Sequence, residues 1–118
     1  MRALHIAADA AHDVDDILAL SEDRFGLPVA GAYRGLLVTA FQDLLRDPSR
    51  PGVASRVGTR PGILLYHLRH SRSRAAEGGV RIARPRHFVV FRVTAAAIEI
   101  LRILHDAMDL PVHLGDED

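Results

Sequence analysis

The residues best able to do chemistry lie near the C-terminal end, in the stretch HDAMD at positions 105–109. It offers an imidazole, His105, and two carboxylates, Asp106 and Asp109, which are acid–base groups and metal ligands. A metal site needs at least three convergent ligands, and a His-Asp-x-x-Asp spacing does not specify one. The aspartates suit the capping of a terminal turn equally well. We therefore expect no metal site and no cofactor, and expect His105 and Asp109 to hold this end of a strand in place rather than touch a target.

A second set of polar residues falls between apolar neighbours in the stretches that alternate like strands. An antiparallel sheet usually keeps one polar, solvated face, so these side chains are explained as paired or edge residues. The alternative is a surface facing an anionic target, since arginine makes bidentate contacts to phosphate or carboxylate and histidine exchanges a proton near neutral pH. Both interpretations stay open for His67, Arg69, Arg92, Arg102 and His105.

A basic stretch separates two of these strands. Residues 69–92 hold seven arginines against one glutamate. The part at 69–86 lacks the interleaved aromatic residues of single-strand binders, and no groove-entering motif is present. Gly78 and Gly79 are too short a run for a phosphate-binding loop, and no Ser/His/Asp set has supporting context. Such a charge run is typical of a solvated, mobile loop, and its role is left open.

The elements that must position these residues begin with a short strand, ALHIAA, followed by a helix at 9–25. Asp9 is the expected N-cap of this helix and Gly26 its stop. A second helix runs from Pro28 to Asp47 and carries one continuous apolar stripe. Two amphipathic helices with a short link form a helical hairpin, whose apolar faces need a sheet to cover.

The second half of the chain predicts three more strands. A Pro/Gly/Ser-rich loop, in which a short irregular strand near Val57 is one option, leads to a strand at 63–70. Residues 86–93 and 97–105 then form an antiparallel hairpin. If Val93 pairs with Ile98, the guanidinium of Arg92 faces the carboxylate of Glu99, an opposite-charge pair that supports this register.

The last strand raises a problem of its own. Its alternation puts Ile98, Ile100 and Leu104 on one side, with Arg102 sharing that side. An arginine among apolar residues needs a partner or an opening to solvent.

Composition limits the class of protein. The 118 residues suit a single domain, with residues 115–118 as a frayed acidic tail. A hydrophobic fraction of 48% with 25% charged residues is typical of a soluble globular protein, and no apolar run is long enough to span a membrane. The N-terminus turns acidic before a signal sequence can form, and no cysteine is present, so a cytoplasmic location is expected.

The charge is zero overall but polarised along the chain. The first helix is acidic, whereas all fifteen basic residues are arginine, which excludes any role that needs a lysine proton. Such polarisation is frequent in domains that meet a charged partner.

Three stretches resemble ParE-type toxins of the RelE/ParE superfamily, the toxic half of bacterial type II toxin-antitoxin modules. The first two are AADAAHDVDDILALSEDRFG and AGAYRGLLVTAFQDLLRDPSRPG, which match the family's first strand and helices. The most specific is RHFVVFRVTAAAIEILRILHDAMD, which follows the family's last two strands. The resemblance covers essentially the whole chain. Phe91 replaces a frequent tyrosine. The arginine-rich insertion is longer than the family's usual loop, and a contact role of its own is left open for it.

The resemblance implies an α+β fold of order βααβββ, with the helical hairpin packed on a small antiparallel sheet. It implies a ribbon-helix-helix antitoxin of the ParD kind and DNA gyrase as the target. Operator DNA is then bound by the antitoxin, so the toxin contacts it only indirectly. No catalytic residue, cofactor or membrane contact is then expected. We expect apolar grooves along the hairpin and the sheet edge to receive the antitoxin, because a segment that folds on binding needs anchor pockets.

RelE relatives share the fold but cut mRNA on the ribosome, which is the alternative function. The catalytic candidates would then be His67, His87, Arg102 and His105. The absence of lysine and the zero net charge favour the gyrase inhibitor, because phosphate neutralisation dominates RNA affinity. A third class is a partner-binding domain without toxicity. For the gyrase inhibitor, the residues expected to face the target or support the fold are Arg69, Arg92, Arg102, His105 and Asp109.

Overall fold

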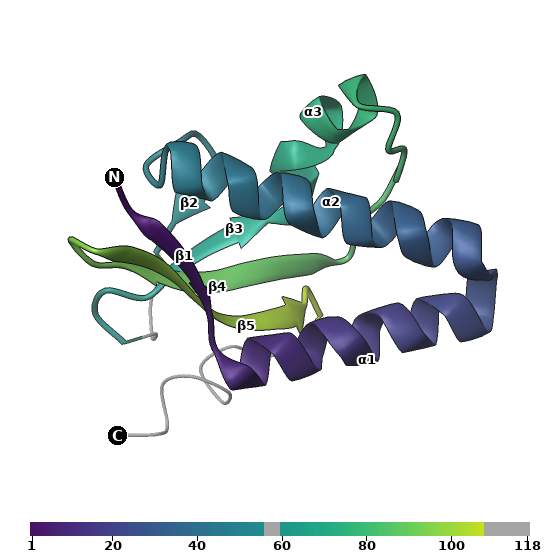
Figure 1. Ribbon diagram of the computed structural model, residues 1–118, viewed down its shortest axis with the longest axis horizontal. Coiled ribbons are helices and arrows are strands. Elements are labelled where there is room, and N and C mark those ends of the chain that lie inside the picture. Colours follow the sequence, from purple (N-terminus) through teal and green to yellow (C-terminus); the bar gives the residue numbers. More distant parts are fainter. Residues whose placement is uncertain (56–59, 108–118) are drawn as a thin grey trace.

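The computed structural model describes residues 1–55 and 60–107, which form a five-stranded sheet with two long helices on one face (Figure 1). The elements in chain order are β1 (Ala3–Ile6), α1 (Ala8–Phe25), α2 (Leu27–Arg46), β2 (Val53–Ala54), β3 (Leu64–His67), the 3-10 helix η1 (Leu68–Ser71), α3 (Arg72–Glu77), β4 (His87–Val93) and β5 (Ala97–His105). The strands lie in the order β1-β5-β4-β3-β2. The expected α+β class and order of the main elements are confirmed, with β2, η1 and α3 added.

Gly26 makes the helical hairpin. Its φ of +89° belongs to the left-handed region that glycine tolerates, and it ends α1 and begins α2 at the same residue. Pro28 follows in the first turn of α2, where no N–H is missed. At the other end of α1 the N-cap is Ala7 and not Asp9, which lies in the first turn and favours the helix through its charge.

The core lies between the helices and the sheet. The apolar stripe of α2 is buried against the helix-facing side of the strands, where Tyr66, Phe91 and Ile100 are fully buried. Each large apolar side chain buried in this way contributes about 1.5–3 kcal/mol. A smaller apolar cluster lies on the other side of the sheet and consists of Ile63, Phe88, Val90 and Leu104.

The β4–β5 hairpin has the predicted register. Val93 pairs with Ile98, and Arg92 lies opposite Glu99 and forms an ion pair with it. The sheet is not wholly antiparallel, however, because β1 pairs with β5 in parallel. The helical hairpin carries the chain from β1 at one edge of the sheet to β2 at the other edge, and the antiparallel run from β2 to β5 then returns to β1 in a parallel orientation.

The predicted phase of β5 is wrong at its second half. The ladder has an irregularity opposite Val90 and Phe91, where one extra residue of β5 is inserted. Beyond this bulge Ile103 takes the helix-facing side, and Leu104 moves to the opposite cluster. An alternating pattern cannot reveal a bulge, because the inserted residue inverts the side of every position after it.

Arg102 finds the partner that its position requires. Its Nε and Nη2 atoms donate to the carboxylate of Asp13 in α1, at 2.7 and 3.1 Å. The backbone N–H of Ile103 donates to the same carboxylate at 2.9 Å. Since β1 pairs with β5 only as far as Ile100, Asp13 satisfies the edge of β5 where β1 has turned away.

The basic stretch is folded and not a solvated loop. The strand predicted at 63–70 ends at His67, whose Nδ1 atom accepts the N–H of Arg69 and starts η1. We call residues 68–86 the arm. Its first part packs on α2, because Arg74 pairs with Asp43, a fully buried aspartate of that helix. The loop before β3 contains a short strand, β2, at Val53–Ala54. Val57, near which the sequence allows such a strand, lies outside the described residues.

Asp43 is held from three directions. Ser71 Oγ donates to Asp43 Oδ2 at 2.6 Å, Arg50 Nη1 lies 3.1 Å from the same oxygen, and Arg74 bonds to Oδ1. Because Ser71 donates its only hydrogen to the carboxylate, Tyr66 donates its hydroxyl hydrogen to Ser71 (2.7 Å). This chain of contacts fixes the arm to α2 and β3.

Among the helices that the structure describes, none combines the length and apolar character that a membrane span requires.

Candidate functional site

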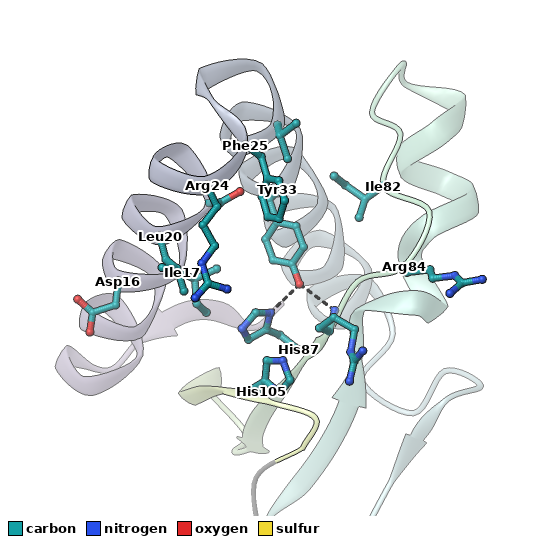
Figure 2. A pocket seen from close by; sticks show the side chains of 13 residues that line it. Asp16, Ile17, Leu20, Arg24, Phe25, Tyr33, Ile82, Arg84, His87 and His105 are labelled. Atoms are coloured by element: carbon teal, nitrogen blue, oxygen red, sulfur yellow. Dashed lines mark hydrogen bonds between the residues drawn. The ribbon is translucent and has the colours of Figure 1, made fainter.

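A groove of about 480 Å³ lies where the helical hairpin projects past the end of the sheet (Figures 1 and 2). One wall is α1, the opposite wall is the arm, and the start of α2 closes the top. The apolar lining consists of Ile17, Leu20, Phe25, Val29 and Ile82. Leu20 is 51% exposed and Phe25 66%, so this apolar surface is open to a binding partner.

The floor of the groove is polar and comes from two neighbouring strands. His87 begins β4 and His105 ends β5, and the two are directly opposite in the ladder with ring centroids 5.3 Å apart. Tyr33 reaches down from α2, and its hydroxyl lies 2.7 Å from His87 Nδ1 (Figure 2). The backbone N–H of Arg86 donates to the same hydroxyl oxygen at 3.1 Å.

This chain of hydrogen bonds sets the tautomer of His87. The Tyr33 oxygen accepts the N–H of Arg86, and His87 Nδ1 is the acceptor within reach of the Tyr33 hydroxyl hydrogen, so we assign that hydrogen to His87 Nδ1. A neutral ring that accepts at Nδ1 carries its proton at Nε2 and is a donor there. Burial, followed by the nearby charge of His105, lowers the pKa of His87 to about 4, so the ring is neutral at pH 7. Burial likewise raises the pKa of Tyr33 to about 12, which keeps its hydroxyl protonated.

His105 offers a second donor. Its Nδ1 atom accepts the backbone N–H of Ala107 at 3.1 Å, which leaves the proton of a neutral ring at Nε2. Together with His87, it gives the floor two N–H donors.

Arginines surround the groove. Arg24 of α1 points over the floor toward the histidines, whereas Arg84 of the arm points outward at the rim (Figure 2). Arg86 also lines the groove, but its guanidinium is 3.0 Å from the carboxylate of Asp106. Asp16 is the acidic residue of the lining, so the surroundings favour an anionic or hydrogen-bond-accepting group.

Asp106 connects the floor to the other side of the sheet. Its Oδ2 atom lies 3.1 Å from His67 Nε2, and His67 stacks on Phe88 of the smaller apolar cluster. Burial acts to raise the pKa of Asp106, but hydrogen bonds from Arg86 and His67 outweigh it, and the pKa falls below its usual value. Asp106 therefore stays ionised and fastens the ends of β3, β4 and β5 together.

The sequence itself matches a known family over most of its length. Residues 4–110 match the model of the family described as ParE toxin of type II toxin-antitoxin system, parDE. The chain belongs to the ParE toxin family. Toxin ParE1 of Caulobacter vibrioides is 29% identical over 117 residues, which cover 98% of this chain and 100% of that relative. The solved structure of the chromosomal ParDE TA system from P. aeruginosa has a TM-score of 0.65 at 23% identity, covering 89% of this chain and 96% of that one. The two share the RelE/ParE-like fold that the sequence predicts.

The structure of this ParE-family chain brings only part of the predicted polar set together. His87 and His105 meet in the groove, while His67 lies on the other side of the sheet with Asp106. Arg102 is committed to Asp13. Arg92 pairs with Glu99 across β4 and β5, Arg69 is exposed at the start of η1, and Asp109 lies outside the described residues.

This distribution limits the chemistry that the ParE-family groove can do. His87 is neutral and bonded through Nδ1, and its pKa of about 4 is far from the neutral range that suits a general acid or base. Within residues 1–55 and 60–107, no three His, Asp or Glu side chains gather as a metal site would require. What the groove offers is apolar walls and N–H donors on its floor.

Sequence reasoning missed three residues that shape the site. Tyr33 lies at a position of the apolar stripe of α2, and the need of a buried hydroxyl for a partner is the signal that could have singled it out. Asp43 lies on the same buried stripe, where a carboxylate demands a cation nearby. Arg24 gave no signal, because an arginine in the last turn of a helix is ordinarily explained by the helix dipole.

Proposed function

We propose that this ParE-family chain inhibits DNA gyrase in the cytoplasm and is neutralised by a small ParD-like antitoxin. The observation that carries the proposal is membership of the ParE toxin family over residues 4–110. The groove supports it as well, since it offers apolar anchor sites and donors for a protein segment, and the pKa of about 4 of His87 lies far below the range that suits acid–base catalysis at neutral pH.

A ribosome-dependent mRNA endonuclease is the second candidate. One observation favours it, the convergence of His87 and His105 beside Arg86 in a single groove. Against it, His67 lies on the other side of the sheet and Arg102 pairs with Asp13. Two of the four candidate catalytic residues are therefore outside the groove.

Expression in a bacterial host tests the proposal. Induction of the full chain alone is expected to stop growth and switch on a DNA-damage reporter, because trapped gyrase leaves broken DNA. Co-expression of the small protein encoded beside the toxin gene is expected to restore growth. Growth arrest without the DNA-damage response, or arrest that the neighbouring protein does not relieve, would contradict the corresponding half of the proposal.

A paired variant separates the two candidates. The double substitution His87→Gln and His105→Gln removes both imidazoles while leaving a side chain that can hydrogen-bond to Tyr33. Toxicity is expected to persist in a gyrase inhibitor. Its loss, in a variant that circular dichroism shows to be folded, would favour the endonuclease.

A further inference from the structure

We propose that the groove receives an acidic amphipathic segment of a partner protein, with a carboxylate of that segment seated on the floor between Arg24, His87 and His105. The inference rests on the proposed function in that the antitoxin is the partner expected to supply such a segment. It adds the chemistry by which the segment is recognised.

The first support is the shape and polarity of the walls. Leu20 and Phe25 of α1, Val29 of α2 and Ile82 of the arm present apolar side chains from three elements around one hollow. Such an arrangement fits alternate apolar residues of a single segment that lies in the groove. Binding of single-stranded nucleic acid usually draws on several aromatic rings for stacking, whereas Phe25 is the one exposed aromatic side chain of this lining and Tyr33 is only 9% exposed.

The second support is the fixed direction of the floor donors. The bonds from Arg86 to Tyr33 and from Tyr33 to His87 leave the Nε2–H of His87 as a donor. The bond from Ala107 to His105 has the same effect on the second ring. Two N–H donors on neighbouring strands match the two oxygens of a carboxylate, which accepts without donating.

The third support is charge. Arg24 points over this floor, and no ion pair joins it to another residue in the part of the chain that the structure describes. Arg84 adds a second cation at the rim, while Arg86 is already paired with Asp106. A carboxylate below Arg24 would gain a charge-assisted hydrogen bond, which is about twice as strong as a neutral one.

Selection from a displayed library of random 16-residue peptides on the immobilised full chain tests this assignment. Recovered peptides are expected to be enriched in Asp or Glu flanked by apolar residues. Replacing that acid by its amide in a recovered peptide is expected to weaken binding about tenfold, the loss of one charge-assisted bond. Failure to recover any peptide, or recovery without acid enrichment, would overturn the inference.

Substitutions locate the binding site. Arg24→Gln is expected to abolish the preference for the acidic peptide over its amide form, whereas Arg34→Gln, an exposed arginine of α2 outside the groove, leaves the preference intact. Leu20→Asp is expected to abolish peptide binding altogether. Val38→Asp is its control, because Val38 is similarly exposed at 46% and does not line the groove. Equal effects of a variant and its control would place the peptide elsewhere.

Two further outcomes would assign the groove to another occupant. Sedimentation that shows a dimer broken by Leu20→Asp would indicate a second copy of this chain. Displacement of the acidic peptide by a short single-stranded RNA would indicate nucleic acid. The proposed function and this inference can fail separately. If the neighbouring protein restores growth and its affinity for this chain is unchanged by Arg24→Gln, the antitoxin remains the partner and only the carboxylate assignment is wrong.

Discussion

Three aspartates, of which Asp43 is buried and Asp13 and Asp106 are partly buried, hold distant parts of this chain together. Asp43 on α2, Asp13 on α1 and Asp106 after β5 each receive an arginine from a distant part of the sequence. Each carboxylate also accepts a bond from a third group, so it fixes a position as well as balancing a charge. Because all the cations are arginines, their planar groups can make two such bonds at once.

Substitution of Asp43 is expected to be costly. Asp43→Ala leaves Arg50 and Arg74 without their shared carboxylate and Ser71 without its acceptor. Loss of one partner of a buried ion pair costs about 3–5 kcal/mol, and because the arginines are partly exposed we expect about 2 kcal/mol of unfolding free energy. Urea denaturation measures this loss of unfolding free energy. Asp23→Ala, an exposed aspartate of α1, is the control, and equal stability of the two variants would contradict the role of Asp43.

His87 predicts a loss of stability in mild acid. Its pKa is lowered from 6.5 to about 4 in the folded chain, so the unfolded chain binds the extra proton between these values. Stability from the neutral ring is therefore complete above pH 6.5 and is lost as the pH falls toward 4. With allowance for the partial exposure of the ring, we expect about 2 kcal/mol less unfolding free energy at pH 4 than at pH 7.

Comparison with His87→Gln separates the pH-dependent stability that the His87 ring contributes from the contributions of other titrating groups. The variant should lose less stability than the native chain between pH 7 and pH 4, while His12→Gln, an exposed histidine of α1, should follow the native chain. Parallel curves for the native chain and His87→Gln would show that the ring is not held neutral.

At the scale of elements, the arm is the part that distinguishes this chain from a plain helical hairpin on a sheet. It is fixed at one end by Ser71 and Arg74 to α2, and at the other by the bond from Arg86 to Tyr33. Between these points Val80 packs against Gly35, where no larger residue would fit without movement. The arm thereby becomes a wall of the groove.

Two glycines of α2 test this packing as a matched pair. Glycine lowers the stability of a helix interior by about 1 kcal/mol relative to alanine. Gly31→Ala meets no atom within 4 Å and is expected to gain most of that amount. Gly35→Ala would place its methyl group 2.8 Å from Val80 Cγ2, so it should gain nothing or lose stability. Urea denaturation measures the change in unfolding free energy for both variants. Equal gains would show that the arm is not packed on α2.

The sequence predicts the elements better than their connections. The helical hairpin is marked by Gly26 and Pro28, and the β4–β5 register by the Arg92–Glu99 pair, because both signals are local. The bulge in β5 and the packing of the arm depend on contacts between residues far apart in the chain, such as Arg74 with Asp43. An apolar groove along the hairpin is expected from the sequence, but its lining residues are not, since its walls come from three elements whose relative placement no local pattern encodes.

At the scale of the whole molecule, the two ends of the helical hairpin differ in how far the sheet covers them. The helical hairpin projects beyond the sheet (Figure 1). Apolar side chains at its turn are left uncovered, such as Leu27, which is 69% exposed. The groove beneath it carries arginines, although the chain as a whole has no net charge. In our proposal, affinity for an anion comes from this local placement of arginines, which favours one shaped protein partner over general attraction to nucleic acid.

The most direct test of the central claim, that this chain inhibits gyrase and has no nuclease chemistry of its own, is made with purified components. The full chain is added to DNA gyrase, ATP and relaxed plasmid, and in parallel to ribosomes translating an mRNA. We predict loss of supercoiling with accumulation of cleaved plasmid after protein digestion, and intact mRNA. Cleavage of the mRNA on the ribosome, with supercoiling unchanged, would contradict the account.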